Sequence, residues 1–305
     1  MSNMNGIIVV NKPQNWTSHD CVAVMRRATG VKRIGHTGTL DPMATGVLPV
    51  CIGTSARIME YLDLDWKTYR CTMKLGITTD TEDVWGEVLT QNDPSNVTEE
   101  QIREVFKGFT GEIEQIPPKY SALKVNGKKL YEYARAGQEV EIKSRKITID
   151  SIEIEEIKGD EITFTVVCSK GTYVRTICKD IGDKLGCGAA MSALTRIASG
   201  VFKIEEAVDI EDVKKMSVEE IEAKLYATDY PLVHFGKIQL DNVQARDFVN
   251  GKRMKRNNIN IVDESRHEEM YNVYYGEEFL GVAKFEGHVL KSHKVFNVRM
   301  QNDSF

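Results

Sequence analysis

Short segments in which apolar and polar residues alternate constrain the fold of this chain more than any other sequence feature. Segment 69–75 places an apolar side chain at every second position, which is the pattern of a strand that buries one face. Segments 147–149 and 162–166 repeat this pattern on either side of Gly159, which predicts a hairpin. Because helical spacing interrupts such strands without a regular βαβ order, we predict an α+β fold with a mixed, largely antiparallel sheet.

Helix and strand signals predict further elements around this sheet. They are buried strands at 6–10 and 47–52, helices that begin at Ser18, Thr54, Thr98 and Val174, and a peripheral helical segment at 205–224. Arg175 follows Val174 but lies off the apolar stripe of its helix, where an ordinary surface ion pair is expected.

The segment from Tyr230 onward has a different pattern. It holds a helix signal at 241–250 and three short strands at 270–275, 279–285 and 295–300. We therefore predict two domains, one at 1–229 and a small β-rich module at 230–305.

Composition argues against the membrane and secreted classes. The chain is 41% hydrophobic and 28% charged, which is typical of a globular protein. Its longest apolar runs, such as 7–10, are far shorter than the roughly 20 residues of a membrane span, and its N-terminus lacks the pattern of a secretory signal. The six cysteines form no C-x-x-C pair, so we expect a cytoplasmic protein with reduced thiols and no metal site.

Charge is distributed unevenly along the chain. The net charge is −5, but segment 80–114 carries ten acidic and two basic residues, whereas segment 119–146 carries eight basic and three acidic residues. Because polyanion binding follows the local field within a Debye length of roughly 8 Å, the basic segment is a candidate nucleic-acid surface. A solvated helix face is the alternative, and we favour it for the acidic segment.

Segment 35–48 is the least ordinary part of the sequence. It holds three glycines, which permit tight turns, and Pro42, which fixes the backbone directly after Asp41. It matches neither a dinucleotide-binding nor a phosphate-binding loop. A loop aspartate is usually a turn former, but Asp41 can act as a nucleophile or base if a cation keeps it ionised in a dry site.

Five segments of the chain together resemble the bacterial tRNA pseudouridine synthase B family, the tRNA pseudouridine-55 synthases. In chain order they are 6–18, 35–48, 69–83, 116–131 and 169–176. The resemblance covers about residues 6–200 in one unbroken order. Segments 248–251 and 279–283 resemble a PUA-type RNA-binding module more loosely. The resemblance implies a catalytic core of the pseudouridine synthase type followed by a PUA-like module.

The resemblance also implies a role for each matched residue. Asp41 corresponds to the catalytic aspartate, and Arg175 to the arginine that pairs with it and keeps the carboxylate charged. The other substrate-binding positions are Tyr69, which stacks on the target uracil, Leu194 on the apolar side of the pocket, Tyr173 as a hydrogen-bonding support beside the pair, and His36, which enters the RNA loop. Lys12 matches a Lys-Pro element near the site, for which we expect a structural role.

The implied activity is isomerisation of uridine 55 in the T arm of tRNA to pseudouridine. The N1–C1′ bond breaks, the uracil turns and C5 bonds to C1′, so we expect no cofactor and no metal. The target nucleotide must first flip out of its stack. We expect a monomer that needs no protein partner and no membrane.

Segment 117–146 corresponds to an insertion, called the thumb, that folds over the RNA. Its candidate phosphate contacts are Lys124, Lys128, Lys129 and Arg135. A second basic cluster at 252–256 is expected near the acceptor side of the tRNA.

Three other functions compete with this one. An RNA-binding or RNA-folding module whose modification activity is secondary would also flip bases and clamp an arm. A guide-RNA-dependent pseudouridine synthase is disfavoured by the thumb-like segment, which suits direct recognition of an arm. A two-carboxylate hydrolase is weaker still, because Asp80 and Asp83 lie in an acidic loop without a partner motif. Whether Asp41 attacks a carbon or removes a sugar proton stays open.

Overall fold

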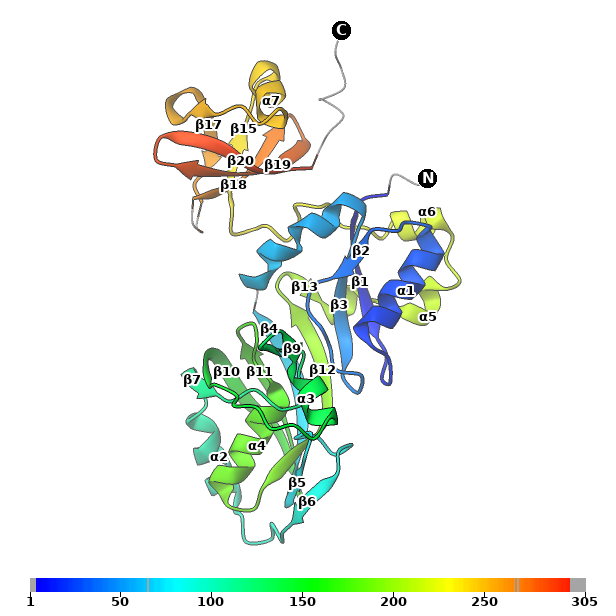
Figure 1. Cartoon of the computed structure of the whole chain (residues 1–305), viewed down its shortest axis with the longest axis vertical. Coiled ribbons are helices and arrows are strands. Elements are labelled where there is room, and N and C mark those ends of the chain that lie inside the picture. The colour runs from blue at the N-terminus through cyan, green and yellow to red at the C-terminus, as the bar shows by residue number, and fades with distance from the viewer. Residues whose placement is uncertain (1–3, 65, 266, 268, 297–305) are drawn as a thin grey trace.

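The computed structural model describes residues 4–64, 66–265, 267 and 269–296 and contains two large sheets. Figure 1 shows an elongated molecule with the C-terminal sheet at one end. The larger sheet has ten strands and the C-terminal sheet has six. Among the described residues, no helix is long and apolar enough to cross a membrane.

The larger sheet is mixed and largely antiparallel, as predicted. Its strands are β1 (Gly6–Lys12), β2 (Ile34–His36), β3 (Thr45–Ile52), β4 (Lys67–Leu75), β7 (Gly111–Gln115), β10 (Arg145–Lys158), β11 (Glu161–Cys168), β12 (Ala189–Ser199), β13 (Phe202–Lys203) and β14 (Val208–Asp209). They run in the order β14-β1-β3-β12-β4-β11-β10-β7, with β2 beside β3 and β13 beside β12. Only the pairings β1–β14 and β3–β12 are parallel within this sheet.

Strand β1 shows why the run at 7–10 is apolar throughout. Ile8 and Val10 pack into the main core with the helices, whereas Ile7 and Val9 pack into a second core on the other face. All four side chains are buried. A strand that is covered on both faces has no solvent-facing positions and therefore no alternation.

Three α-helices of more than two turns cover the sheet, together with two short α-helices and two 3-10 helices. They are α1 (Ser18–Thr29), α2 (Glu99–Lys107), α4 (Val174–Leu185), α5 (Ile210–Val213), α6 (Val218–Glu222) and the 3-10 helices η1 (Gly53–Leu64) and η2 (Ile204–Glu206). Thr17 rather than Ser18 caps α1, because its side chain forms a capping box with Asp20. The helix expected from Thr54 is the 3-10 helix η1. All six cysteines are free and buried, as predicted.

Segment 116–144 leaves the sheet between β7 and β10, whose ends pair with each other. It holds the two-stranded hairpin of β8 (Lys124–Val125) and β9 (Lys128–Lys129) and the helix α3 (Leu130–Arg135). A second small hairpin, β5 (Ile77–Thr79) and β6 (Val88–Gln91), follows β4.

The C-terminal sheet has a core of its own and packs against the larger domain. Its elements are β15 (Gly236–Gln239), α7 (Asn242–Val249), β16 (Met254–Lys255), η3 (Arg256–Asn258), β17 (Asn260–Asp263), β18 (Met270–Tyr275), β19 (Glu278–Glu286) and β20 (Val289–Val295). Phe296 and Met270 share the second core with Ile58 of η1, and Lys294 pairs with Glu60 at 2.7 Å.

The strand predicted at 295–300 can be compared with the structure only at Val295 and Phe296. Val295 ends β20, the last strand within the described residues, which pairs with β19 from Val289 to Val295, and Phe296 lies outside it. Residues 297–300 lie outside the described part of the chain.

Phe164 of β11 ties α2 to the sheet, so its loss should cost more stability than any surface change. Its side chain is fully buried, and its ring lies edge-on to Phe106 at 5.2 Å. We expect Phe164→Ala to lower the free energy of unfolding by about 3–5 kcal/mol in urea denaturation. The control Leu89→Ala, at a side chain that is 62% exposed, should change it by less than about 0.5 kcal/mol. Equal effects of the two variants would contradict this packing.

Candidate active site

Asp41 lies in the loop between β2 and β3, and hydrogen bonds hold the backbone of this loop on both sides of Asp41. The Oγ of Ser18 accepts a hydrogen bond from the Leu40 amide at 2.9 Å. The carbonyl of Asp41 accepts one from Ala44 at 3.0 Å, and the carbonyl of Pro42 accepts one from Asn15 at 2.8 Å. The side chain of Asp41 is 40% exposed, so its carboxylate is accessible while its backbone is fixed.

Two buried cations hold the same loop by its carbonyl oxygens. Lys12 Nζ donates to Pro42 at 3.1 Å and also to Pro13 and Trp16. Arg196 donates to the carbonyls of Gly38 at 3.2 Å and Val47 at 2.7 Å. Burial lowers the pKa of Lys12 to about 8, while Cys21 and Asp41 act in the opposite direction. Lys12 therefore anchors the backbone, and Arg196 is a loop anchor that the sequence analysis missed.

Gly46 permits this close packing. Its φ is +101°, and a Cβ at this position would lie 2.3 Å from the carbonyl oxygen of Arg196. Only glycine fits where the loop enters β3 beside β12.

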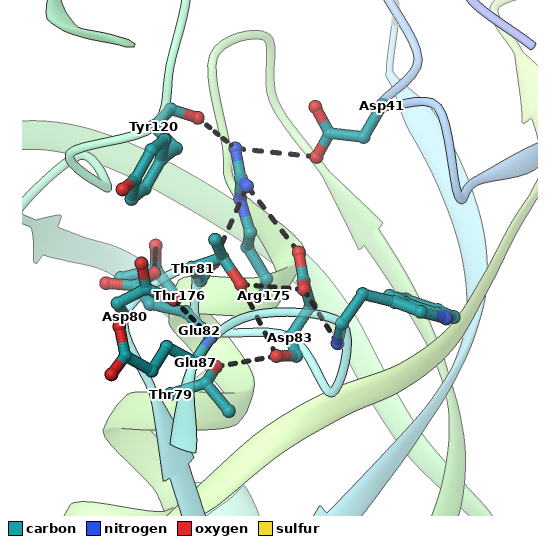
Figure 2. A network of polar contacts seen from close by, with 11 residues as sticks. Asp41, Thr79, Asp80, Thr81, Glu82, Asp83, Glu87, Tyr120, Arg175 and Thr176 are labelled. Atoms are coloured by element: carbon teal, nitrogen blue, oxygen red, sulfur yellow. Dashed lines mark hydrogen bonds and ion pairs between the residues drawn. The ribbon is translucent and has the colours of Figure 1, made fainter. Parts of the chain in front are cut away.

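Arg175 is buried beside Asp41, which the helix pattern alone did not predict. It is 6% exposed, and its Nη2 lies 3.5 Å from Asp41 Oδ2. The same Nη2 donates to the carbonyl of Tyr120 at 2.7 Å, and Nη1 lies 3.8 Å from Asp83 Oδ2. Figure 2 shows this guanidinium between the two carboxylates. The pairing of Asp41 with Arg175, which the resemblance implied, is therefore present in the geometry.

Asp83 is the second carboxylate of this network, and the sequence analysis had set it aside. Its Oδ1 accepts hydrogen bonds from the Thr81 hydroxyl at 2.7 Å and the Trp85 amide at 3.2 Å. Burial raises the pKa of Asp83, and the Thr81 hydrogen bond and the Arg175 charge oppose that shift. In the sequence, Asp83 stands in a run of polar residues after a strand, which indicates only a turn. This local pattern does not reveal that Arg175, 92 positions away, is its partner.

Tyr69 and Leu194 line neighbouring strands on the same side of the sheet. Tyr69 of β4 is the register partner of Arg196, and Leu194 of β12 is the partner of Cys71. Leu194 is buried and Tyr69 is half-buried. Burial raises the pKa of the Tyr69 phenol, so the ring is neutral, and the Arg196 charge opposes the shift.

His36 and Tyr173 are the other two predicted substrate positions. His36 ends β2, and burial lowers its pKa to about 4, with His19 and Arg196 adding to the shift. The ring is therefore neutral near pH 7, and it lies edge-on to His19 at 5.2 Å. The ring of Tyr173 lies 5.8 Å from the guanidinium carbon of Arg175, so its contact with the pair is through its face.

Three of the four predicted thumb cations contact aromatic rings. Lys128 lies over Tyr133 at 5.8 Å, and Lys129 and Arg135 each lie over Tyr131 at 5.3 Å. In the part of the chain that the structure describes, no carboxylate pairs with these three residues or with Lys124. The cluster at 252–256 differs, because Lys252 pairs with Asp247 at 2.5 Å and Arg256 with Glu264 at 3.2 Å.

Comparison with known proteins identifies relatives over nearly the whole chain. Residues 26–174 match the TruB family pseudouridylate synthase N-terminal domain, and residues 175–233 match the tRNA pseudouridylate synthase B C-terminal domain. A tRNA pseudouridine synthase B from Alkaliphilus oremlandii is 44% identical over 303 residues, which are 98% of this chain and 100% of the relative. One from Clostridioides difficile is 42% identical over an alignment of 305 positions, which covers 96% of this chain and 100% of the relative.

Solved structures share the fold of both sheets. The crystal structure of a Cbf5-Nop10-Gar1 complex superposes with a TM-score of 0.76 at 26% identity, over 96% of this chain and 85% of that one. An archaeal box H/ACA sRNP Nop10-Cbf5 complex gives a TM-score of 0.76 at 24% identity, over 99% and 90% of the two chains.

Because a Cβ at Gly46 would clash with the carbonyl oxygen of Arg196, replacing Gly46 by alanine should cost more stability than replacing Gly159, which has free space around it. Gly46→Ala should lower the free energy of unfolding by more than about 3 kcal/mol, because strain and a main-chain clash add. Gly159→Ala is the matched control: its φ is +61° and nothing lies within 4 Å of the added Cβ, so only about 1 kcal/mol of strain is expected. Urea denaturation of the two variants measures the difference. Equal losses would contradict the described loop packing.

Proposed function

The chain belongs to the TruB family of pseudouridylate synthases, and we propose that the site around Asp41 isomerises uridine 55 in the T arm of tRNA to pseudouridine. The observation that carries this proposal is the ion pair of Asp41 with the buried Arg175 at 3.5 Å. It lies in a chain whose relatives of 42–44% identity are named tRNA pseudouridine synthase B. We assign residues 1–229 to the catalytic domain and 230–305 to a PUA-like RNA-binding module.

The reaction rearranges bonds within one nucleotide. The N1–C1′ bond breaks, the uracil turns, C5 bonds to C1′, and the proton lost from C5 is balanced by one gained at N1. This balance needs no oxidant, reductant or group donor, so we propose that the enzyme uses no cofactor. Asp41 acts as the nucleophile or base, and in either role it must be ionised.

Arg175 pairs with Asp41 and holds its carboxylate in place. A guanidinium keeps its charge at any working pH and presents its donors in a plane that fits a carboxylate. The Tyr120 carbonyl binds the same Nη2 that faces Asp41, and Asp83 lies against Nη1, so these two contacts restrict the rotation of the guanidinium. The guanidinium held in this way fixes the position of the Asp41 carboxylate through the ion pair.

The remaining site residues suit a flipped base. Tyr69 and Leu194 form the apolar side of a pocket in which the detached uracil can turn without leaving. His36 is neutral because of its lowered pKa, so it can enter an RNA loop and replace lost stacking without a charge. Flipping costs roughly a few kcal/mol, which these contacts offset.

We propose that the thumb, residues 117–146, binds the RNA backbone. Lys124, Lys128, Lys129 and Arg135 have no carboxylate partners among the described residues, so their charge is available to phosphates. The enzyme then works as a cytoplasmic monomer on tRNA, without an obligatory protein partner. In the cluster at 252–256, Lys252 and Arg256 are paired with carboxylates, so a second phosphate contact would fall to Arg253 and Lys255.

Replacing Asp41 by asparagine removes the charge and keeps the shape. We expect Asp41→Asn to slow single-turnover pseudouridine formation by about 10²–10⁴-fold or more, with tRNA affinity unchanged within about twofold. Asp160→Asn is the matched control, because Asp160 also has one cation at 3.4 Å and is 44% exposed, far from the site. It should turn over normally. A folded Asp41→Asn protein that binds tRNA and keeps substantial turnover would refute the proposed function.

Thumb lysines should contribute affinity rather than chemistry. Lys128→Ala/Lys129→Ala should weaken tRNA binding and reduce the log–log salt slope of the affinity by roughly one to two. The control pair Lys107→Ala/Lys215→Ala removes two exposed lysines that already have carboxylate partners and should leave the slope unchanged. Equal slopes for both double variants, measured by filter binding between about 50 and 200 mM salt, would place the thumb lysines away from the RNA.

A further inference from the structure

We propose that Gln115 and Arg145, the residues at which the thumb leaves and rejoins the sheet, position the catalytic Arg175 by holding Tyr173 at the start of α4. This inference rests on the proposed function, because it assigns Arg175 to the pair that does the chemistry. Gln115 ends β7, Arg145 begins β10, and the two are register partners. Neither residue touches Asp41 in any described contact, so both act through α4.

Gln115 holds the main chain of Tyr173 from both sides. Its Nε2 donates to the Tyr173 carbonyl at 3.0 Å, and its Oε1 accepts from the Tyr173 amide at 2.8 Å. The side chain is 1% exposed. A primary amide is the only common side-chain group that offers a donor and an acceptor in this parallel arrangement. The Gln115 side chain therefore forms with Tyr173 the two hydrogen bonds that the backbone of a neighbouring strand would form.

The backbone of Tyr173 determines the direction in which Arg175 points. Tyr173 is the N-cap of α4, and no side-chain hydrogen bond caps this helix. Arg175 is the second residue of the helix, so a rotation of the Tyr173 backbone moves its guanidinium directly. Fixing the amide and the carbonyl of Tyr173 thus fixes where Arg175 points.

Arg145 holds the same residue by its ring. Its guanidinium carbon lies 4.9 Å from the centre of the Tyr173 ring, which Arg175 also contacts at 5.8 Å. Arg145 also donates to the carbonyl of Gly171. A Cβ at Gly171 would lie 3.3 Å from this guanidinium, so the glycine lets Arg145 approach the turn before α4.

A third contact joins the thumb to Arg175 without an intermediary. The carbonyl of Tyr120, within the thumb, accepts the hydrogen bond from Arg175 Nη2 at 2.7 Å. Contacts with Arg175 or with Tyr173 therefore come from Gln115 just before the thumb, from Tyr120 within it and from Arg145 near its end. The segment proposed to bind RNA and the cation that pairs with Asp41 form one connected unit.

The test separates positioning from RNA binding and from folding. Gln115→Met fills a similar volume without either hydrogen bond, and Gln115→Glu keeps the acceptor for the Tyr173 amide but places a carboxylate against its carbonyl. The control is Asn272→Leu, which removes a buried amide that donates to Leu232 in the C-terminal module at 3.0 Å. Melting temperature, tRNA dissociation constant and single-turnover tritium release from C5-labelled uridine are measured for each protein. The unaltered enzyme measured alongside reports on the proposed function itself.

We expect both Gln115 variants to release tritium at least tenfold more slowly than the unaltered enzyme, with the tRNA dissociation constant changed less than threefold. Asn272→Leu should keep the normal rate whatever its melting temperature. If Gln115→Met fails to melt cooperatively, Gln115→Glu decides the question. A folded variant with the normal rate, or a rate that falls only as tRNA affinity falls, overturns the inference. An inactive unaltered enzyme would instead overturn the proposed function.

Discussion

The burial of one guanidinium between two carboxylates is the interaction on which the rest of the site depends. Arg175 is 6% exposed, and the charge of such a group costs several kcal/mol to remove from water unless partners replace the solvent. Asp41, Asp83 and the carbonyl of Tyr120 are those partners. They come from three separate segments, so the β2–β3 loop, the turn after β5 and the thumb must all be in place before the charge is satisfied.

The loop that presents Asp41 is organised by main-chain contacts more than by side-chain packing. Lys12 and Arg196 donate to its carbonyl oxygens, and neither forms an ion pair within the described ranges. Both side chains are buried, and the charge of Asp41 raises the pKa of Lys12 against the effect of burial.

Sequence reasoning predicted elements whose signals are local and missed contacts whose partners are distant. The alternation at 69–75 and the apolar stripe of α4 identify their elements because one strand or helix contains the whole pattern. Arg175 lies off that stripe, and it is surrounded by the β2–β3 loop, the turn at 79–83 and the thumb. Its burial could therefore not be read from α4 alone. Asp83 lacked a partner in sequence for the same reason. Asp41 itself followed from family resemblance, since a lone aspartate before proline also suits a turn.

The proposed function requires that the site around Asp41 and Arg175 acts on RNA, and one measurement tests this most directly. Purified enzyme is incubated with an unmodified T-arm stem-loop, without added metal or cofactor, and pseudouridine is mapped at single-nucleotide resolution. The account predicts conversion of the uridine at position 55 and of no other uridine in the loop. Binding of the stem-loop without pseudouridine, or pseudouridine only at other positions, would contradict it.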